Sequence, residues 1–182
     1  MASISANMAL ERLNTDVQEN TSIVLPVLPS GESLEEAYIP DYILNPEMDM
    51  PEEEVDGQKY IGVLKIPVLS LELPVISEWS YPSLRIAPCR YAGSAYLNSM
   101  VIAAHNYYSH FGYLKDLSPG DEVTFTDVDG NIFRYEVSAL EILSPFAVEE
   151  MTNGDWDLTL FTCTVGGQSR VTIRCAQAVT SP

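Results

Sequence analysis

Short apolar or alternating stretches, separated by turn-forming residues, run along this chain from residue 60 to near its end. They are rich in Val, Ile, Phe and Tyr, which favours β-strands over helices. Strands are expected at residues 60–66, 71–76, 101–104, 122–126, 131–137, 158–162 and 170–175. Short helices are expected near residues 81–86 and 110–117. Many short strands joined by Gly, Asp and Pro turns indicate an all-β barrel or sandwich.

One turn signal is especially clear. The sequence Asp-Val-Asp-Gly at residues 127–130 lies between two predicted strands, 122–126 and 131–137. Asp and Gly adopt the backbone conformations that tight hairpin turns require. These two strands are therefore predicted to form a β-hairpin.

The first 58 residues follow a different pattern. Residues 1–20 are expected to form an amphipathic helix with its apolar residues roughly on one side; these are Ile4, Met8, Leu10, Leu13 and Val17. Residues 21–58 hold five prolines and the acidic run Glu52-Glu53-Glu54, which indicates an extended or poorly ordered segment. The predicted organisation is an acidic N-terminal segment at 1–58, serving as linker or lid with a possible helix, followed by a β-barrel domain at 59–182.

Composition narrows the possible partners. The chain of 182 residues is 46% apolar, enough for the core of one domain, and carries 26 acidic against 9 basic residues, a net charge of −17. Twelve of the acidic residues and no Lys or Arg lie between Leu13 and Gln58. Such a surface repels nucleic acid and anionic membranes, so neither is an expected partner. No apolar run is long enough to span a membrane, and no signal peptide is visible.

Three cysteines raise the question of reactive thiols. They are Cys89, Cys163 and Cys175, and their spacing forms neither a disulfide framework nor a Cys/His zinc motif. No metal or other cofactor is therefore expected. Cys89 and Cys175 either pair with each other or are buried as small apolar side chains.

Cys163 is the candidate nucleophile. It ends an apolar predicted strand and precedes a polar turn, residues 164–169, that leads to Arg170. A thiol becomes nucleophilic as the thiolate, which nearby positive charge favours. If the turn forms a hairpin, Cys163 and Arg170 face each other with Cβ atoms about 4.5–5.5 Å apart. Arg174 is the competing cation, but the same register places it opposite Thr159, so Arg170 is favoured.

His105 is the candidate acid. It follows the wholly apolar strand 101–104, whose end can deliver a side chain to a cleft. An imidazole titrates near neutral pH and can therefore serve as a general acid. The only other histidine, His110, is interpreted as mainly structural.

The local sequences around these residues resemble the sortase family. Thr159-Leu-Phe-Thr-Cys163 is similar to the family signature T-L-x-T-C, and Ala104-His105 with the loop at 111–122 is similar to its histidine strand and following loop. Residues 60–67 and 73–76 resemble its first strands, and Arg-Val-Thr-Ile-Arg at 170–174 resembles the strand carrying its arginine. The resemblance extends from about residue 60 to 178 and keeps the order His, Cys, Arg.

The resemblance implies a closed eight-stranded sortase-type β-barrel with short helices and the activity of a cysteine transpeptidase. Cys163 would attack a C-terminal sorting signal of the Leu-Pro-x-Thr-Gly kind, Arg170 would stabilise the oxyanion and His105 would protonate the leaving amine. The acceptor would be an amine of a peptidoglycan precursor or a pilin lysine. The enzyme would lie on the outer face of the cell membrane, held by an N-terminal anchor not present in this chain.

Substrate contacts are also implied. Ala104 and Thr162 flank the reactive residues and are expected to shape the groove, with strand packing as the alternative. The loop at 144–157, which contains Trp156, is expected to read the Leu-Pro part of the substrate, with a core position for Trp156 as the alternative.

Three alternatives bear on the function. The interval of seven residues from Cys163 to Arg170 is shorter than in most sortases, which leaves the subclass open. A second alternative is a cysteine transpeptidase that acts directly on peptidoglycan. Such enzymes keep His close to Cys in sequence, whereas His105 and Cys163 are 58 residues apart, which argues against this alternative. A non-catalytic β-barrel binding module on the cell surface would instead have an inert Cys163 thiol.

Overall fold

The structure, a computed structural model, describes residues 4–20, 38–164 and 166–178, and for residues 17–20 and Cys163 it describes the backbone only. The strands of the described chain are β1 (Glu53–Val55), β2 (Gln58–Ile66), β3 (Leu71–Ile76), β4 (Cys89–Ala92), β5 (Met100–Ala104), β6 (Glu122–Asp127), β7 (Ile132–Leu143), β8 (Leu158–Cys163) and β9 (Arg170–Gln177). The helices are α1 (Ile4–Asn20), α2 (Asp41–Leu44), α3 (Tyr81–Leu84) and α4 (Val148–Thr152), with short 3₁₀ turns η1 (Pro67–Leu69), η2 (Ala95–Leu97) and η3 (Leu114–Asp116).

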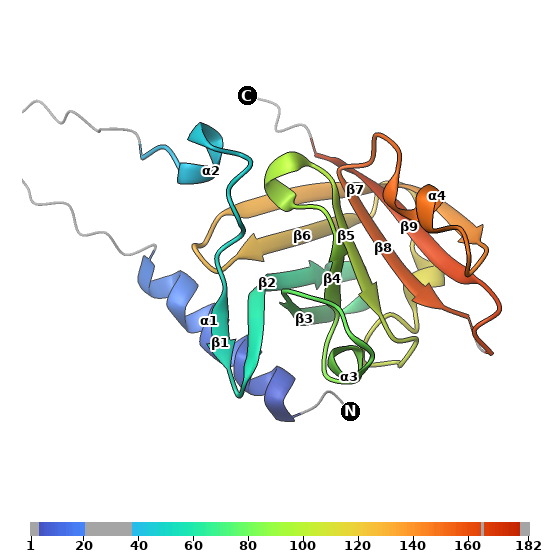
Figure 1. The fold of residues 1–182 in the computed structure, drawn as a ribbon, viewed down its shortest axis with the longest axis horizontal. Helices are drawn as coiled ribbons and strands as arrows, with labels where there is room; N and C mark the ends of the chain where they lie inside the picture. The colour runs from blue at the N-terminus through green and yellow to red at the C-terminus, as the bar shows by residue number, and fades with distance from the viewer. Residues whose placement is uncertain (1–3, 21–37, 165, 179–182) are drawn as a thin grey trace, which may run out of the picture.

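Eight of these strands close into a barrel, as predicted. The order is β2-β3-β4-β5-β8-β9-β7-β6, and β6 pairs again with β2 to complete the ring (Figure 1). The β3–β4 and β5–β8 pairs are parallel, whereas the other pairs are antiparallel. Strand β1 lies outside the ring and adds to the free part of β2. The predicted hairpin is present as β6 and β7.

The barrel interior forms the main core. Alternate residues of β7, Phe133, Tyr135 and Val137, point inward and are buried, whereas their neighbours on the strand are exposed. On β9, by contrast, both faces are buried from residue 171 to 175, because a connection containing α4 packs on the outside of β8 and β9. This outer layer is where the candidate site is found.

Helix α1 forms within the predicted range, and its buried face matches the predicted one only in part. Ala6, Ala9 and Leu13 are buried against β2 and β3, whereas Ile4 is 81% and Met8 53% exposed. Small alanine side chains let the helix axis approach the sheet closely, and that contact outweighed the larger apolar residues. The side chain of Val17 lies outside the described part. No helix among the described residues is long and apolar enough to cross a membrane.

Part of the segment expected to be extended packs on the barrel. The ring of Tyr42 in α2 stacks on Tyr96 with centroids 4.7 Å apart, and Met50 is buried in the main core. Strand β1 then pairs with β2 from within the same segment. Residues 21–37 lie outside the described part, so the linker or lid role of residues 1–58 stays a prediction.

The helix expected at 110–117 is only a 3₁₀ turn, η3, preceded by hydrogen-bonded turns. Phe111, Leu114 and Leu117 are all buried, and their spacing of three residues matches the period of a 3₁₀ helix rather than that of an α-helix. The apolar pattern therefore reported burial correctly, although the predicted helix type was wrong.

Barrel closure depends on the close approach of the β6 backbone to Gly62 of β2. This residue pairs with Val75 of β3 and Asp127 of β6, and a Cβ atom there would overlap the backbone carbonyl of Thr126. We expect Gly62→Ala to lower the free energy of unfolding by more than about 3 kcal/mol, measured by urea unfolding, because backbone would have to move.

Gly120→Ala is the matched control. Gly120 has φ +94° but open space around its Cβ position, so its substitution should cost only about 1 kcal/mol of backbone strain. Equal losses for the two variants would contradict the close-approach argument.

Candidate active site

The three predicted reactive positions meet at one end of the barrel. Parallel pairing aligns Ala104 at the end of β5 with Thr162 near the end of β8, so the next residues, His105 and Cys163, are neighbours in register. Antiparallel pairing of β8 with β9 then places Cys163 opposite Arg170. The register that the sequence suggested for Cys163 and Arg170 is therefore confirmed. Figure 1 shows the ends of β5 and β8 side by side at the start of β9.

Strand alternation sorts these residues by face. Leu158 and Leu160 point into the barrel core, whereas Phe161 belongs to an outer cluster with Val101, Ala103 and Met151. Cys163 is the next position of the outer row on β8, and its side chain lies outside the described part. His105 continues the outer row of β5 in the same way.

His105 is half-buried where the outer row of β5 ends. Its ring stacks on Tyr107 with centroids 4.7 Å apart, and its backbone carbonyl accepts a hydrogen bond from the Phe111 amide at 3.0 Å. Burial lowers the pKa of His105 below its usual value, and the positive charge of Arg85 lowers the pKa further. A neutral imidazole is therefore favoured, which reduces the fraction able to donate a proton at neutral pH.

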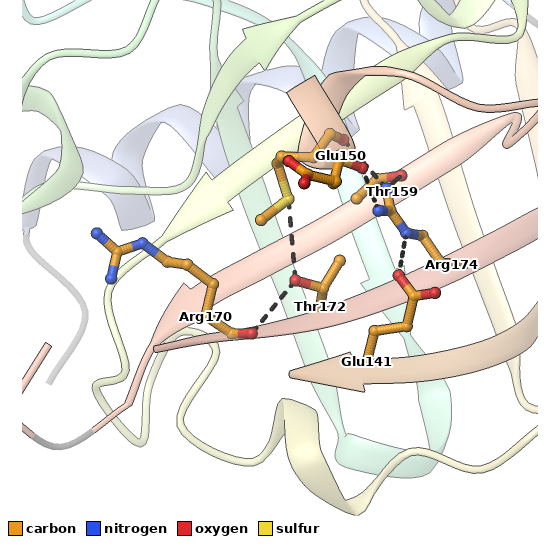
Figure 2. A network of polar contacts seen from close by, with 7 residues as sticks. Glu141, Glu150, Thr159, Arg170, Thr172 and Arg174 are labelled. Carbon is orange, nitrogen blue, oxygen red and sulfur yellow. Dashed lines mark hydrogen bonds and ion pairs between the residues drawn. The ribbon is translucent and has the colours of Figure 1, made fainter. Parts of the chain in front are cut away.

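Arg170 and Arg174 have different surroundings. The Arg170 guanidinium donates to the carbonyls of Gly167 and Ser169 at 3.2 and 3.3 Å and lines an outer groove. Arg174 is only 3% exposed, lies opposite Thr159 as expected, and is enclosed by hydrogen bonds. Figure 2 shows the Arg170 guanidinium pointing away from the network around Arg174.

The outer groove has a volume of about 200 Å³ and runs beside Arg170. It is lined by aromatic, aliphatic and small polar residues: Trp79, Tyr81, Leu84, Tyr91, Ala103, Ser144, Pro145, Ala147, Val148, Met151, Phe161 and Arg170. The rings of Trp79, Tyr91 and Phe161 form a chain along it, with centroids 5.4 and 5.2 Å apart. The groove suits an extended apolar peptide segment beside a cationic group.

The predicted substrate contacts are placed differently. Ala104 belongs to the barrel core, and Thr162 is 3% exposed with no hydrogen-bond partner for its hydroxyl among the described residues. Trp156 is half-buried in the loop before β8 and does not line the groove. Substrate contact by these three residues stays a prediction.

Sequence reasoning missed the aromatic residues of the groove; within the chain of Trp79, Tyr91 and Phe161, Trp79 is the most exposed. It follows β3 in a polar loop, and it is 41% exposed although it contacts Tyr81 and Tyr91. Its signal in the sequence was the cluster Trp-Ser-Tyr-Pro at residues 79–82, where large aromatic residues stand in an otherwise polar turn.

The other two cysteines are unsuited to nucleophilic chemistry. Cys89 and Cys175 are fully buried and free, so the pairing alternative is wrong. Burial raises the pKa of each thiol to about 12, which keeps both protonated at neutral pH.

His110 is 2% exposed and lies behind the site, its ring 5.5 Å from that of Tyr107. Burial, followed by the charge of His105, lowers its pKa to about 4. Its Nδ1 atom has no hydrogen-bond partner among the described residues. It therefore stays neutral in the folded protein near pH 7.

Comparisons with known proteins agree on one family. The sortase domain family matches residues 64–178 of the chain. Among solved structures, a sortase D5 transpeptidase of Clostridium perfringens is 18% identical with a TM-score of 0.67, covering 97% of this chain and 100% of that chain. Sortase A of Corynebacterium diphtheriae is 23% identical with a TM-score of 0.59, covering 97% and 85%.

A third similar structure is sortase C of Clostridium perfringens with the C-terminal cell wall sorting motif. It is 19% identical with a TM-score of 0.59, covering 94% of this chain and 86% of that chain. At these identities the structural likeness concerns the fold alone. No curated protein matches the chain.

The effect of Arg85 on His105 can be measured directly. We expect Arg85→Gln to raise the pKa of His105, because removal of the nearby positive charge makes the imidazolium less costly. NMR titration resolves this, since the chain has only two histidines and burial lowers the pKa of His110 to about 4. Arg134→Gln, at an arginine paired with Glu122, should leave the His105 titration unchanged. A His105 pKa that stays constant or falls in Arg85→Gln would refute the assignment.

Buried His110 should make stability depend on pH. The folded-state pKa of about 4 lies below the ordinary 6.5, so between these values the unfolded chain binds a proton that the folded protein does not. The contribution of His110 to the free energy of unfolding is full above pH 6.5 and falls by up to about 3 kcal/mol as pH drops toward 4.

Urea unfolding of the wild type and His110→Phe at several pH values tests this. The difference in pH dependence between the two isolates His110 from the many carboxylates. Parallel curves from pH 7 to 4.5 would show that His110 is protonated in the fold at no extra cost.

Proposed function

Since this chain belongs to the sortase family and is a cysteine transpeptidase, we propose that it cleaves the C-terminal sorting signal of surface proteins and transfers them to an amine. The proposed signal is of the Leu-Pro-x-Thr-Gly kind. The observation that supports the proposed site best is the β5–β8–β9 register, which brings His105, Cys163 and Arg170 together.

Cys163 is the proposed nucleophile. Its thiolate attacks the carbonyl carbon before the scissile bond, and collapse of the tetrahedral intermediate breaks the C–N bond and leaves an acyl-enzyme thioester. An incoming amine then attacks the thioester and regenerates the thiolate. Water in place of the amine gives slow hydrolysis.

Arg170 is the proposed oxyanion partner. It lies opposite Cys163 in register and lines the groove, so its guanidinium is close to the reacting carbonyl. A fixed positive charge directed at the developing oxyanion contributes several kcal/mol to many acyl transfers. The same charge favours the thiolate form of Cys163.

His105 is the proposed general acid. It donates a proton to the leaving amine and recovers one from the incoming amine, so no net proton remains on the enzyme. Because its pKa is lowered, the proposed active form, a thiolate with an imidazolium, is a minor fraction at neutral pH unless substrate binding raises that pKa. This predicts a modest turnover rate.

The groove is the proposed recognition site for the apolar part of the signal. Its aromatic chain of Trp79, Tyr91 and Phe161 offers flat apolar surfaces for a leucine and a proline. The loop at 144–157 supplies the opposite wall through Ser144, Pro145, Ala147, Val148 and Met151. The similar structure of sortase C with the C-terminal cell wall sorting motif supports a sorting-signal peptide as the ligand.

The proposed acceptors are an amine of a peptidoglycan precursor or a pilin lysine. The proposed location is the outer face of the cell membrane, with an anchor preceding the residues of this chain. The division into an N-terminal segment at 1–58 and a catalytic barrel at 59–182 belongs to the same proposal, although β1 already joins the barrel sheet from within the first part.

Mass spectrometry after mixing the protein with a panel of sorting-signal peptides tests the function. We expect a covalent acyl adduct on Cys163 with at least one peptide and none in Cys163→Ala, because only the thiolate can form the thioester. Arg170→Lys keeps the charge but loses the planar fork of donors, so its adduct should form about 10²-fold more slowly.

Each outcome has a clear meaning. An adduct confined to the wild-type thiol establishes acyl-enzyme formation at Cys163 and identifies the motif. No adduct with any peptide, together with a Cys163 thiol that iodoacetamide does not alkylate, would instead favour the non-catalytic binding module. A free amine that shortens the lifetime of the adduct identifies the acceptor class.

A further inference from the structure

Arg174 connects three parts of the molecule around one buried guanidinium. Nε donates to the Glu141 carboxylate on β7 at 2.9 Å, and Nη1 donates to the Thr159 hydroxyl on β8 at 3.0 Å. Nη1 and Nη2 also donate to the backbone carbonyls of Met151 and Glu150 in α4, the former at 3.1 Å. A single side chain thus holds the strand before the β7–β8 loop, the loop itself and the strand after it (Figure 2).

The same strand carries the proposed oxyanion partner. Arg170, Thr172 and Arg174 occupy alternate positions of β9 and therefore share its outer face. Between the two arginines, the Thr172 hydroxyl lies 3.8 Å from the Met151 sulfur (Figure 2). Any movement of α4 relative to Arg170 would have to break these contacts.

The β7–β8 loop at 144–157, which Arg174 contacts, forms one wall of the groove. Met151, whose carbonyl accepts from Arg174, lines the groove together with Val148 and Ala147 of the same turn. Within the described chain, the hydrogen bonds between residues 144–157 and the rest of the molecule involve Arg174, Thr172 and Gln177, whose amide donates to the Asp157 carboxylate at the end of the loop at 2.6 Å; the others are local. Because α4 is only five residues long, it has little stability of its own.

The chemistry of arginine suits this task. A buried cation is costly unless its donors are satisfied, and here one partly exposed carboxylate and three neutral acceptors satisfy them. The planar guanidinium reaches acceptors in several directions at once, which a lysine ammonium on the same strand position cannot reproduce.

We propose that Arg174 is a positioning residue that holds the α4 wall at a fixed distance from β8 and thereby sets the affinity for the sorting-signal peptide. This inference rests on the proposed function of the groove. Arg174 touches neither the peptide nor the reacting atoms, so its effect is on binding of the peptide rather than on the chemical step.

Arg174→Met tests the proposal, since methionine fills much of the volume but donates no hydrogen bond. With the peptide that acylates the wild type, KM should rise about tenfold or more, because a loosened wall binds the peptide less well, while kcat changes by less than about threefold. Alkylation of Cys163 by iodoacetamide without peptide should keep its wild-type rate. Arg134→Met, at an exposed arginine paired with Glu122, is the matched control and should leave KM unchanged.

Hydrogen exchange tests whether the hydrogen bonds of Arg174 hold the 144–157 loop in place, and it requires no enzymatic activity. In Arg174→Met, the amides of Met151 and Asn153, which bond within the loop, should exchange at least about tenfold faster, while β2 and β6 keep their protection. Thr159→Val removes a single acceptor and should give a smaller change in the same direction. It carries the test if Arg174→Met does not fold.

The outcomes separate the two proposals. If the wild type acylates but KM is unchanged in both variants, or kcat falls with KM constant, Arg174 does not set peptide affinity and the inference is overturned. If the wild type forms no acyl-enzyme, the proposed function fails. Hydrogen exchange alone then shows whether Arg174 holds the loop: faster exchange at 144–157 in Arg174→Met supports this role, and unchanged exchange refutes it.

Discussion

The parallel pairing of β5 with β8 is the constraint on which the candidate site depends. In most of this barrel neighbouring strands are antiparallel, so the end of one strand meets the beginning of the next. Here two strands end together, and the residues that follow Ala104 and Thr162 emerge side by side. If either strand shifted by one residue, the position that follows it, His105 or Cys163, would turn from the outer face to the core. The buried apolar residues of both strands oppose such a slip and thus position the reactive residues.

The placement of the positively charged residues also shapes the candidate site. The chain has nine Lys and Arg residues, and five of them pair with carboxylates of the described chain. Of the other four, Arg170 lines the groove, Arg85 acts on His105, and Arg90 lines a second pocket that shares Trp79 and Tyr91 with the groove. In a strongly acidic protein, positive charge is therefore present beside the groove, where the proposed thiolate of Cys163 and the proposed oxyanion would form. Burial, and after it the charge of Arg85, lowers the pKa of His105, so its surroundings disfavour the imidazolium form.

Sequence patterns predicted most strands because their apolar residues are short, clustered and bounded by turn residues. They missed β1, which lies in the acidic segment expected to be extended or poorly ordered, and β4, whose residues Cys-Arg-Tyr-Ala carry no alternation that distinguishes a strand from a loop. They predicted the buried face of α1 only in part: Leu13 is buried as expected, but large apolar residues such as Ile4 were weighted above Ala6 and Ala9. At the site, the register of Cys163 with Arg170 followed from the length of the intervening turn, which is a local property. The inward orientation of Ala104 and Thr162 follows from strand alternation, but which face would be the core depends on the closed barrel.

The sequence alone therefore determined most of the strands, the hairpins and the order of the candidate chemical groups, because these depend on residues close together in the chain. It also determined the family resemblance through short motifs around His105 and Cys163. Only the tertiary structure decided that Trp79, Tyr91 and Phe161 line one groove and that Arg174 joins β7, β8 and α4. These contacts link segments far apart in sequence, and their geometry depends on barrel closure and on which faces become buried. Local propensity and hydrophobic period carry no information about such distances.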